Sequence, residues 1–506
     1  MDQDTRTPAL TIGALLSDCA ARYGERAAIR FMENGASQDK SYRTLFDDSL
    51  RAAAELRRRF PRGGHIVITG HTSYAYLVWL NAIFISGCTA VPVGFDEPPA
   101  EKRRLLLDSD ADGVLYAPKC FDPAAARDDC ARVRFCEAID AADFAALPDA
   151  PADWPSWELP ERCSAIIYTS GTTGTRKGAM LSSAALVSNV YFREMDFEGG
   201  HVALNVLPMH HIFSFSCDYL KNLKDGVTIC LNSSLAALGK ELLCWEPTVL
   251  RLVPVIADSL LRRVRLLRRR EPELTPREAA ERVFGRRLRN IIVSGASYTA
   301  ANDREFAEMG ITIRQGYGMT ETGPRIAVPD GGTCAASGGR IISICQVRLV
   351  DGEIQVRSPS LMIGYYKRPE ETAAVFTPDG WFRTGDLGRV TPDRELFIVG
   401  RCKNVIILPN GENVSPEELE RKYAADPLIR EIEVYEDQGE IACDVYPDYD
   451  YARKTGVADL EAAVRALVAA KNASDTAARE IDRVKIRQTP LEKTNTGKIK
   501  RRRWNP

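Results

Sequence analysis

The segment YTSGTTGTRKGAM, residues 168–180, has the composition of a loop that binds phosphates. An apolar run at residues 164–168 indicates a strand that leads into this loop. Glycines let backbone N–H groups approach an anion, hydroxyls add hydrogen-bond donors, and a lysine adds charge. The alternative is a flexible surface loop that happens to be rich in glycine and threonine. The candidate phosphate-binding residues are Thr169, Ser170, Gly171, Thr172, Thr173, Gly174 and Lys177.

This loop does not have the GxxxxGK[ST] spacing of the common P-loop NTPases. That pattern requires a second glycine five positions after the first, and Arg176 stands five positions after Gly171. Because an arginine replaces the required glycine, the sequence disfavours that class of enzyme.

Helical and strand patterns alternate on both sides of the loop. Strands are expected at residues 65–70, 89–93, 113–116, 164–168, 202–207, 227–231 and 290–293. Helical segments separate them, including one that ends near Phe60. This βαβ rhythm predicts a mixed α/β fold with mostly parallel sheets.

Beyond Gly331 the pattern changes to shorter strands bounded by turns, as at residues 353–357 and 396–399, which indicates a β-rich subdomain. A boundary is expected near Gly400, so that residues 1–400 form a large N-terminal domain and residues 401–506 a small α+β C-terminal domain. In the small domain we expect a helix after Ser415-Pro416, strands at 431–435, 441–446 and 484–487, and a helix at 458–471.

The composition excludes several classes of protein. The chain has 506 residues, 45% of them hydrophobic and 27% charged, with a formal net charge of -2. These values are typical of a soluble globular protein and give no sign of nucleic-acid binding. The 13 cysteines show no CxxC pair or Cys/His cluster, which favours reduced thiols in the cytoplasm over disulfides or zinc. No export signal is expected, and the interrupted apolar stretch at residues 76–95 predicts a buried helix and strand, not stable membrane insertion.

Four further segments extend the pattern of the phosphate loop along the chain. They are QGYGMTETGP (315–324), GWFRTGDLG (380–388), GRCKNVIILPNGENVSPEELE (400–420) and KTNTGKIKR (493–501). Together with residues 168–180, in this order and spacing, they make the chain resemble the adenylate-forming (AMP-dependent synthetase/ligase) superfamily over residues 10 to 503. Within it, the sequence is closest to long-chain fatty acyl-CoA synthetases.

The resemblance implies a two-step reaction. A carboxylate attacks the α-phosphorus of ATP and pyrophosphate leaves, and a thiol then takes the acyl group from the acyl-AMP. By resemblance, Glu321 helps to bind Mg²⁺, Thr320 contacts the α-phosphate and Tyr317 lies against the adenine. Asp386 accepts hydrogen bonds from the ribose hydroxyls, because a carboxylate suits two donors, and Arg401 lies near the ribose and phosphates.

Two other places complete the implied nucleotide site. Gly295 and Ala296 would line the adenine pocket at the end of a strand, where α/β sheets bind ligands. Lys498 would be catalytic with Thr320 and Glu321, since its ammonium suits the charge that develops at the α-phosphate. The alternative for Lys498 is one member of a solvated basic tail.

The superfamily also implies that the small C-terminal domain is mobile. It rotates between the two half-reactions about a hinge residue, which is Lys403 here. Gly411 would then face the active site, where the lack of a side chain leaves room for a pantetheine arm.

The acyl pocket is expected around LPMHHIFSFSC, residues 207–217, which resembles the pocket wall of long-chain acyl-CoA synthetases. His211 and Phe213 would shape this pocket, with Gly316 and Gly318. Asp218 does not clearly match the residue that anchors an amino group in amino-acid adenylation domains. A fatty or other hydrophobic acid is therefore preferred, although residues 334–350 depart from the usual pattern beside the acyl site.

Three functions remain open. The first is an acyl-CoA synthetase that uses MgATP, a carboxylic acid and coenzyme A. The second is an acyl-AMP ligase that loads a separate carrier protein, and the third is a non-catalytic ATP- or acyl-binding homologue. The joint presence of Thr172, Glu321, Asp386, Arg401 and Lys498 argues against the third. The basic run at residues 262–270 reads as a solvated helix face, with a membrane or CoA contact as the alternative.

Overall fold

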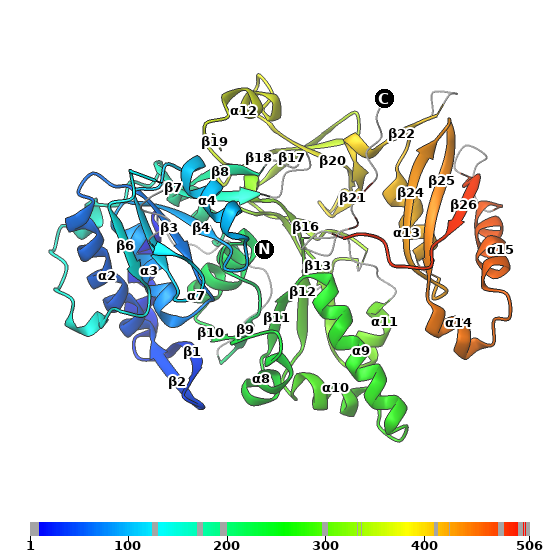
Figure 1. The fold of residues 1–506 in the computed structure, drawn as a ribbon, viewed down its shortest axis with the longest axis horizontal. Coiled ribbons are helices and arrows are strands. Elements are labelled where there is room, and N and C mark those ends of the chain that lie inside the picture. Colours follow the sequence, from blue (N-terminus) through cyan, green and yellow to red (C-terminus); the bar gives the residue numbers. More distant parts are fainter. Residues whose placement is uncertain are drawn as a thin grey trace.

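A seven-stranded sheet contains the two strands that flank the phosphate loop. The computed structural model describes residues 10–123, 130–169, 176–192, 200–295, 302–330, 332–334, 336–408, 413–424, 426–473, 480–493, 499 and 501. In spatial order the strands of this sheet are β19 (Gly364–Tyr365), β8 (Lys177–Ser182), β7 (Cys163–Thr169), β4 (Thr89–Val93), β3 (His65–Thr69), β5 (Gly113–Tyr116) and β6 (Phe135–Ala138) (Figure 1). The run from β7 to β6 is parallel, whereas β8 is antiparallel to both β7 and β19.

A second seven-stranded sheet is also mostly parallel. Its strands, in spatial order, are β13 (Thr312–Gln315), β12 (Asn290–Val293), β11 (Val249–Leu252), β9 (Val202–Asn205), β10 (Thr228–Leu231), β1 (Ala27–Glu33) and β2 (Ala36–Ser41). All neighbours are parallel except the β1–β2 hairpin. The prediction of mostly parallel α/β sheets is confirmed.

One apolar core joins the two sheets through three helices. These are α1 (Ile12–Tyr23), α2 (Tyr42–Arg59) and α3 (Tyr74–Ile85). The core contains Ile68 of the first sheet and Ile229 of the second, both fully buried. Nearly every residue of α3 is buried, and β4 follows directly, as expected for the apolar stretch at residues 76–95. Among the described residues, no helix is long and apolar enough to cross a membrane.

The β-rich subdomain follows the second sheet. It contains a four-stranded antiparallel sheet of β17 (Gln346–Val350), β18 (Glu353–Arg357), β20 (Phe382–Val390) and β21 (Leu396–Arg401). A three-stranded sheet of β14 (Tyr317–Gly318), β15 (Arg325–Val328) and β16 (Arg340–Ile341) packs with it, since both contribute to one buried cluster that includes Ile326 and Val356.

The C-terminal part has its own core and lies at one side of the molecule, beyond β21 (Figure 1). Its sheet is formed by β24 (Ile429–Asp437), β25 (Glu440–Pro447) and β26 (Arg483–Ile486). The helices are α13 (Pro416–Ala424), α14 (Tyr449–Thr455) and α15 (Leu460–Asn472), and β22 (Ile406–Ile407) pairs with β23 (Asn413–Val414). The predicted α+β order is confirmed, whereas the boundary at residue 400 stays a prediction.

A π-helix at Phe213–Leu220 is the main element that the sequence analysis did not predict. Such helices are rare, and when they occur they often lie at functional sites. This one is almost entirely buried between the two sheets and falls in the segment expected to form the acyl pocket. The long basic run lies at the end of α9 (Pro254–Arg270), and all 13 cysteines are free thiols.

Candidate active site

Tyr317, Asp386 and Arg401 come from three separate motifs and meet in the structure. The Tyr317 hydroxyl donates to Oδ2 of Asp386 at 2.6 Å, and Nε of Arg401 lies 2.7 Å from Oδ1 of the same carboxylate. Asp386 on β20 pairs directly with Arg401 on β21, so the strand register sets their contact. The Asp386 side chain is buried and that of Arg401 is 42% exposed, which leaves the guanidinium accessible from solvent.

Local hydrogen bonds hold the backbone at Asp386. The Thr384 hydroxyl donates to the carbonyl of Ile354 at 2.7 Å and accepts from the Asp386 N–H at 3.0 Å. Burial raises the pKa of Tyr317 well above its usual value, and the Asp386 charge acts in the same direction. The phenol therefore stays protonated and remains a donor at neutral pH.

Thr320 and Glu321 lie on a single 3₁₀ turn, Thr320–Thr322, directly after β14. A buried hydroxyl holds the turn, because Thr322 donates to the carbonyl of Pro324 at 2.6 Å. Gly318 allows the chain to approach here, since a Cβ at this position would lie 2.0 Å from the same carbonyl oxygen. The turn therefore presents Thr320 and Glu321 from a fixed backbone.

Glu321 and Lys177 are connected by an aromatic ring. The Tyr365 hydroxyl donates to Oε1 of Glu321 at 2.8 Å, and the Lys177 ammonium lies over the Tyr365 ring, 5.0 Å from its centroid. Nζ of Lys177 also forms an ion pair with Glu371 of α12 (Pro369–Val375) at 2.5 Å. Two motifs distant in sequence thus converge on one tyrosine that the sequence analysis did not single out.

The ends of the phosphate loop are fixed by the strands that it connects. Thr169 at the end of β7 faces Lys177 at the start of β8, and the Thr169 hydroxyl donates to the Lys177 carbonyl at 3.4 Å. The remaining predicted members of this loop lie outside the described residues; they are Ser170, Gly171, Thr172, Thr173 and Gly174.

The ends of the neighbouring parallel strands β12 and β13 lead to Gly295, predicted to line the adenine pocket, and Gly316, predicted to line the acyl pocket. The Ser294 hydroxyl, just after β12, donates to the carbonyl of Gly316 at 3.2 Å, and the Gly316 N–H donates to Val293 at 2.9 Å. Gly295 follows with a φ of +84°, a conformation that favours glycine. Carboxyl ends of parallel strands are the usual ligand-binding edge of such sheets. Ala296 lies outside the described residues.

The expected acyl-pocket wall combines the paired histidines with a buried polar network. His211 is exposed, its ring centroid lies 4.1 Å from that of His210, and Phe213 is half-buried at the start of the π-helix. Burial holds the pKa of His210 well below its usual value, with His211 adding to the effect, so His210 is neutral at pH 7.

Asp218 lies deeper in this wall and is already engaged. Its carboxylate accepts from the side-chain amide of Asn205 at 2.7 Å and lies 3.6 Å from a guanidinium nitrogen of fully buried Arg251. Burial raises the Asp218 pKa to about 6 against the opposing effect of Arg251. A carboxylate committed to protein partners in this way agrees with the expectation that it does not anchor a substrate amino group.

Lys403 and Gly411 are predicted to serve the domain rotation and the second half-reaction, and Lys498 is predicted to serve the first. Lys403 is exposed on a 3₁₀ turn, Cys402–Asn404, that follows β21. Gly411 and Lys498 lie outside the described residues. Residues on both sides of Lys498 in the sequence form ion pairs. Lys493 pairs with Glu431 at 2.6 Å, and Arg501 pairs with Glu420 at 2.5 Å.

The described part of the chain contains no group of three or more His, Cys, Asp or Glu side chains placed to hold a metal ion. Glu321 is a partly exposed carboxylate that Tyr365 connects to the phosphate-loop lysine. One carboxylate next to a phosphate site fits Mg²⁺, which is typically held by one or two carboxylates together with substrate phosphates and water.

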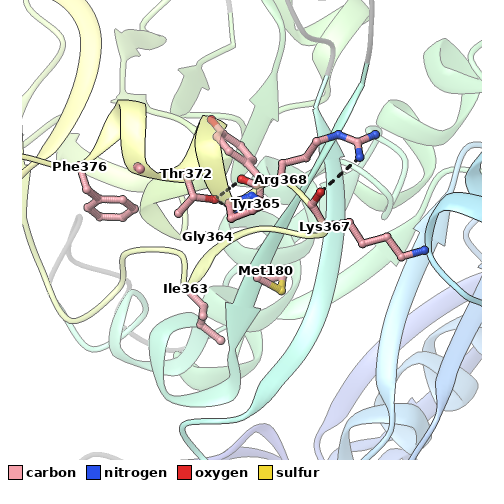
Figure 2. A pocket seen from close by; sticks show the side chains of 10 residues that line it. Met180, Ile363, Gly364, Tyr365, Lys367, Arg368, Thr372 and Phe376 are labelled. Carbon is pink, nitrogen blue, oxygen red and sulfur yellow. Dashed lines mark hydrogen bonds between the residues drawn. The ribbon is translucent and has the colours of Figure 1, made fainter.

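A surface pocket of about 480 Å³ adjoins this site (Figure 2). It is lined by Met180 of β8, Ile363, Tyr365, and Thr372 and Phe376 at α12. Tyr365 therefore separates this pocket from the Glu321 carboxylate. Sequence reasoning missed Tyr365 and Glu371, and the GYYKRPEET run at residues 364–372 is the only local signal for them, because their contacts depend on the pairing of β19 with β8.

The two sheets, the β-rich subdomain and the convergence of the motifs define the adenylate-forming class of enzyme. The model of the AMP-binding enzyme family matches residues 16–366. The chain belongs to this family and is an acid–thiol ligase of its AMP-forming type.

Similarity to named proteins supports the same class. The chain is 30% identical over 410 residues to a feruloyl-CoA synthase from an Amycolatopsis species, which covers 74% of this chain and 78% of that protein. It is 30% identical over 330 residues to the peroxisomal long chain acyl-CoA synthetase 7 of Arabidopsis thaliana, with coverage of 55% and 46%. The fold is similar to the crystal structure of ATP-bound MatB from Rhodopseudomonas palustris, with a TM-score of 0.79, 24% identity and 97% coverage of both chains.

Proposed function

We propose that this enzyme converts a hydrophobic carboxylic acid into an acyl-AMP, with release of pyrophosphate, and then transfers the acyl group to the thiol of coenzyme A. The main support is that residues from separate motifs meet in two clusters. Tyr317, Asp386 and Arg401 form a site suited to a ribose and its phosphates, and Lys177 and Glu321 form one suited to a polyphosphate and a cation.

Each group has a chemical role in the first step. Arg401 and Lys177 supply positive charge, which stabilises the negative charge that develops on the phosphates. Asp386 accepts hydrogen bonds from the ribose hydroxyls. Arg401, whose side chain is 42% exposed, must move away from the carboxylate for them to bind. Thr320 donates to the α-phosphate, and Lys498 donates to the α-phosphate and the attacking carboxylate.

We propose that Glu321 helps to hold Mg²⁺ together with the ATP phosphates. When bound, the ion neutralises phosphate charge and assists pyrophosphate departure. Glu321 is suited to this because it is a partly exposed carboxylate whose position is fixed by Tyr365.

For the acid we propose a fatty acid, on the basis of the paired histidines and Phe213 at the start of the π-helix. The relatives include both a feruloyl-CoA synthase and a long chain acyl-CoA synthetase, so an aryl acid is the main competing substrate. His211, Phe213, Gly316 and Gly318 are the residues that we assign to this pocket.

We further propose that residues 401–506 rotate about Lys403, so that Gly411 opens a path for pantetheine in the second step. Free thiols at all 13 cysteines fit a reducing compartment, and we propose the cytoplasm.

The test is product identification by mass spectrometry after incubation with MgATP, coenzyme A and a panel of fatty, aryl and amino acids. We expect AMP and a fatty acyl-CoA as the products. An aroyl- or cinnamoyl-CoA product would correct the substrate class. Acyl-AMP that accumulates despite coenzyme A would replace the acceptor by a carrier protein.

A further inference from the structure

The Tyr365 side chain contacts two residues that the proposed function places in the nucleotide site. Its hydroxyl donates to Oε1 of Glu321 at 2.8 Å, and its ring lies beneath the Lys177 ammonium, 5.0 Å from the ring centroid. A hydrogen bond fixes the direction of the carboxylate, and a cation–π contact holds the cation over one face of the ring.

We propose that Tyr365 is a positioning residue that holds the Glu321 carboxylate in the orientation needed to bind the divalent cation of the metal–ATP complex. The inference rests on the proposed function, and it adds a residue to which neither the sequence motifs nor the relatives' names assign a role.

The backbone around Tyr365 is held rigidly enough for this task. Tyr365 on β19 pairs with Ala179 on β8, the strand that begins with Lys177, and the Tyr365 N–H donates to the Thr372 hydroxyl at 2.9 Å. Figure 2 shows Thr372 and Tyr365 side by side at the edge of the pocket. On the other side, the Met362 N–H donates to the Glu321 carbonyl at 2.8 Å. The segment 362–365 therefore joins the turn that carries Glu321 to the strand that carries Lys177.

The hydrogen bond from the Tyr365 hydroxyl reaches one of the two Glu321 carboxylate oxygens, at 2.8 Å. A donor bound to one oxygen of a metal-binding carboxylate restricts its rotation. Partners of this kind typically contribute about 10- to 100-fold to metal affinity.

The adjacent residue provides a matched control. The Tyr366 hydroxyl donates to Oδ2 of Asp110 at 2.8 Å, so Tyr366→Phe removes the same kind of bond one residue away. Asp110 already has a second partner, because Lys367 lies 2.7 Å from the same oxygen. Neither Tyr366 nor Asp110 has a role in the proposed reaction.

The experiment measures binding, not turnover. Free Mn²⁺ is followed by electron paramagnetic resonance while the enzyme is titrated in the presence of α,β-methylene-ATP, which cannot release pyrophosphate. Tyr365→Phe is expected to weaken Mn²⁺ binding to the enzyme–nucleotide complex about 10-fold, whereas Tyr366→Phe changes it less than 2-fold. Equal affinities in Tyr365→Phe and the wild type would overturn the inference.

Two further measurements separate positioning from a purely structural role. In a Glu321→Ala background, Tyr365→Phe is expected to cause no additional loss of Mn²⁺ affinity, because the two residues act together. An additional loss of about 10-fold in that background would contradict the inference. If the wild-type enzyme binds no Mn²⁺–nucleotide complex, the proposed function fails with it; if only the difference between the variants is missing, the role of Tyr365 alone is wrong.

Discussion

At the scale of single residues, Lys177 pairs with Glu371, and in the proposed function the ATP phosphates compete for the same ammonium group. Nζ of Lys177 lies 2.5 Å from a Glu371 oxygen, and the carboxylate is 40% exposed. An exposed ion pair of this kind contributes about 0.2–1 kcal/mol, so phosphate binding must displace a weak but real partner. In the proposed function, Lys177 must therefore leave Glu371 before it can bind the ATP phosphates.

Glu371→Gln is therefore expected to tighten nucleotide binding about 1.4- to 5-fold, the equivalent of the ion pair that no longer competes. Titration calorimetry with α,β-methylene-ATP measures the affinity. Glu370→Gln removes an equal charge from the same helix and controls for long-range electrostatics. Equal effects of the two variants would show that Glu371 does not compete for Lys177.

In the proposed function, Lys498 is the residue on which the first half-reaction depends most. Lys498→Ala is expected to lower acid-dependent pyrophosphate release at least 100-fold, because one preorganised donor at the developing charge is lost. Transfer from supplied acyl-AMP to coenzyme A should remain within a few-fold of the wild type. Lys485→Ala, which removes an exposed charge from β26, serves as the control. Equal loss of both half-reactions would contradict the assigned role.

At the scale of elements, the turn that presents Thr320 and Glu321 depends on the absence of a side chain at Gly318. A Cβ there would lie 2.0 Å from the Pro324 carbonyl oxygen, whereas at Gly316 the nearest atom would be 3.6 Å away. The first distance is a hard clash with backbone and the second is an ordinary contact.

Gly318→Ala is accordingly expected to destabilise the protein by about 1–3 kcal/mol, the usual cost of overpacking, and to lower its melting temperature. Gly316→Ala should leave the melting temperature within about 1 °C of the wild type. Differential scanning calorimetry of both variants checks the pair. Similar melting temperatures would mean that the turn relaxes without cost.

Local sequence patterns predict much of the fold because many strands are short apolar runs between turn residues. The strands expected at residues 89–93, 113–116, 290–293 and 353–357 have the same bounds as β4, β5, β12 and β18. The π-helix at Phe213–Leu220 was not predicted, because its geometry depends on buried partners such as Asn205 and Arg251 that lie elsewhere in the chain.

In the candidate site, too, some residues could be predicted from the sequence and others could not. Motif order predicts Tyr317, Asp386 and Arg401 as one group, and the structure brings them within hydrogen-bonding distance. The role of Tyr365 could not be predicted, since it requires β19 to pair with β8 across a long stretch of intervening chain. Sequence motifs identify residues that touch a common ligand more readily than residues that position them.

For the whole molecule, the C-terminal part meets the rest at the end of β21. The Ser415 hydroxyl and a guanidinium nitrogen of Arg421 both donate to the Val399 carbonyl, at 3.1 and 2.7 Å. Lys403 lies between Val399 and both donors in the chain. Rotation about Lys403 would therefore break both of these hydrogen bonds.

Gly411→Leu is expected to slow thioester formation at least 10-fold while adenylation stays within about 2-fold, because the added side chain blocks the path of pantetheine only in the second arrangement. Single-turnover kinetics of the two half-reactions measures the ratio. Ala470→Leu adds the same side chain at an exposed position of α15 and should change neither rate. An unchanged ratio in Gly411→Leu would remove the case for the second arrangement.

Activation through an acyl adenylate is tested by analysing the nucleotide products formed from MgATP and a panel of acids without coenzyme A. We expect acid-dependent pyrophosphate release, about one per enzyme, together with enzyme-bound acyl-AMP that coenzyme A then consumes. Formation of ADP and phosphate, or no pyrophosphate with any acid, would contradict activation through an acyl adenylate.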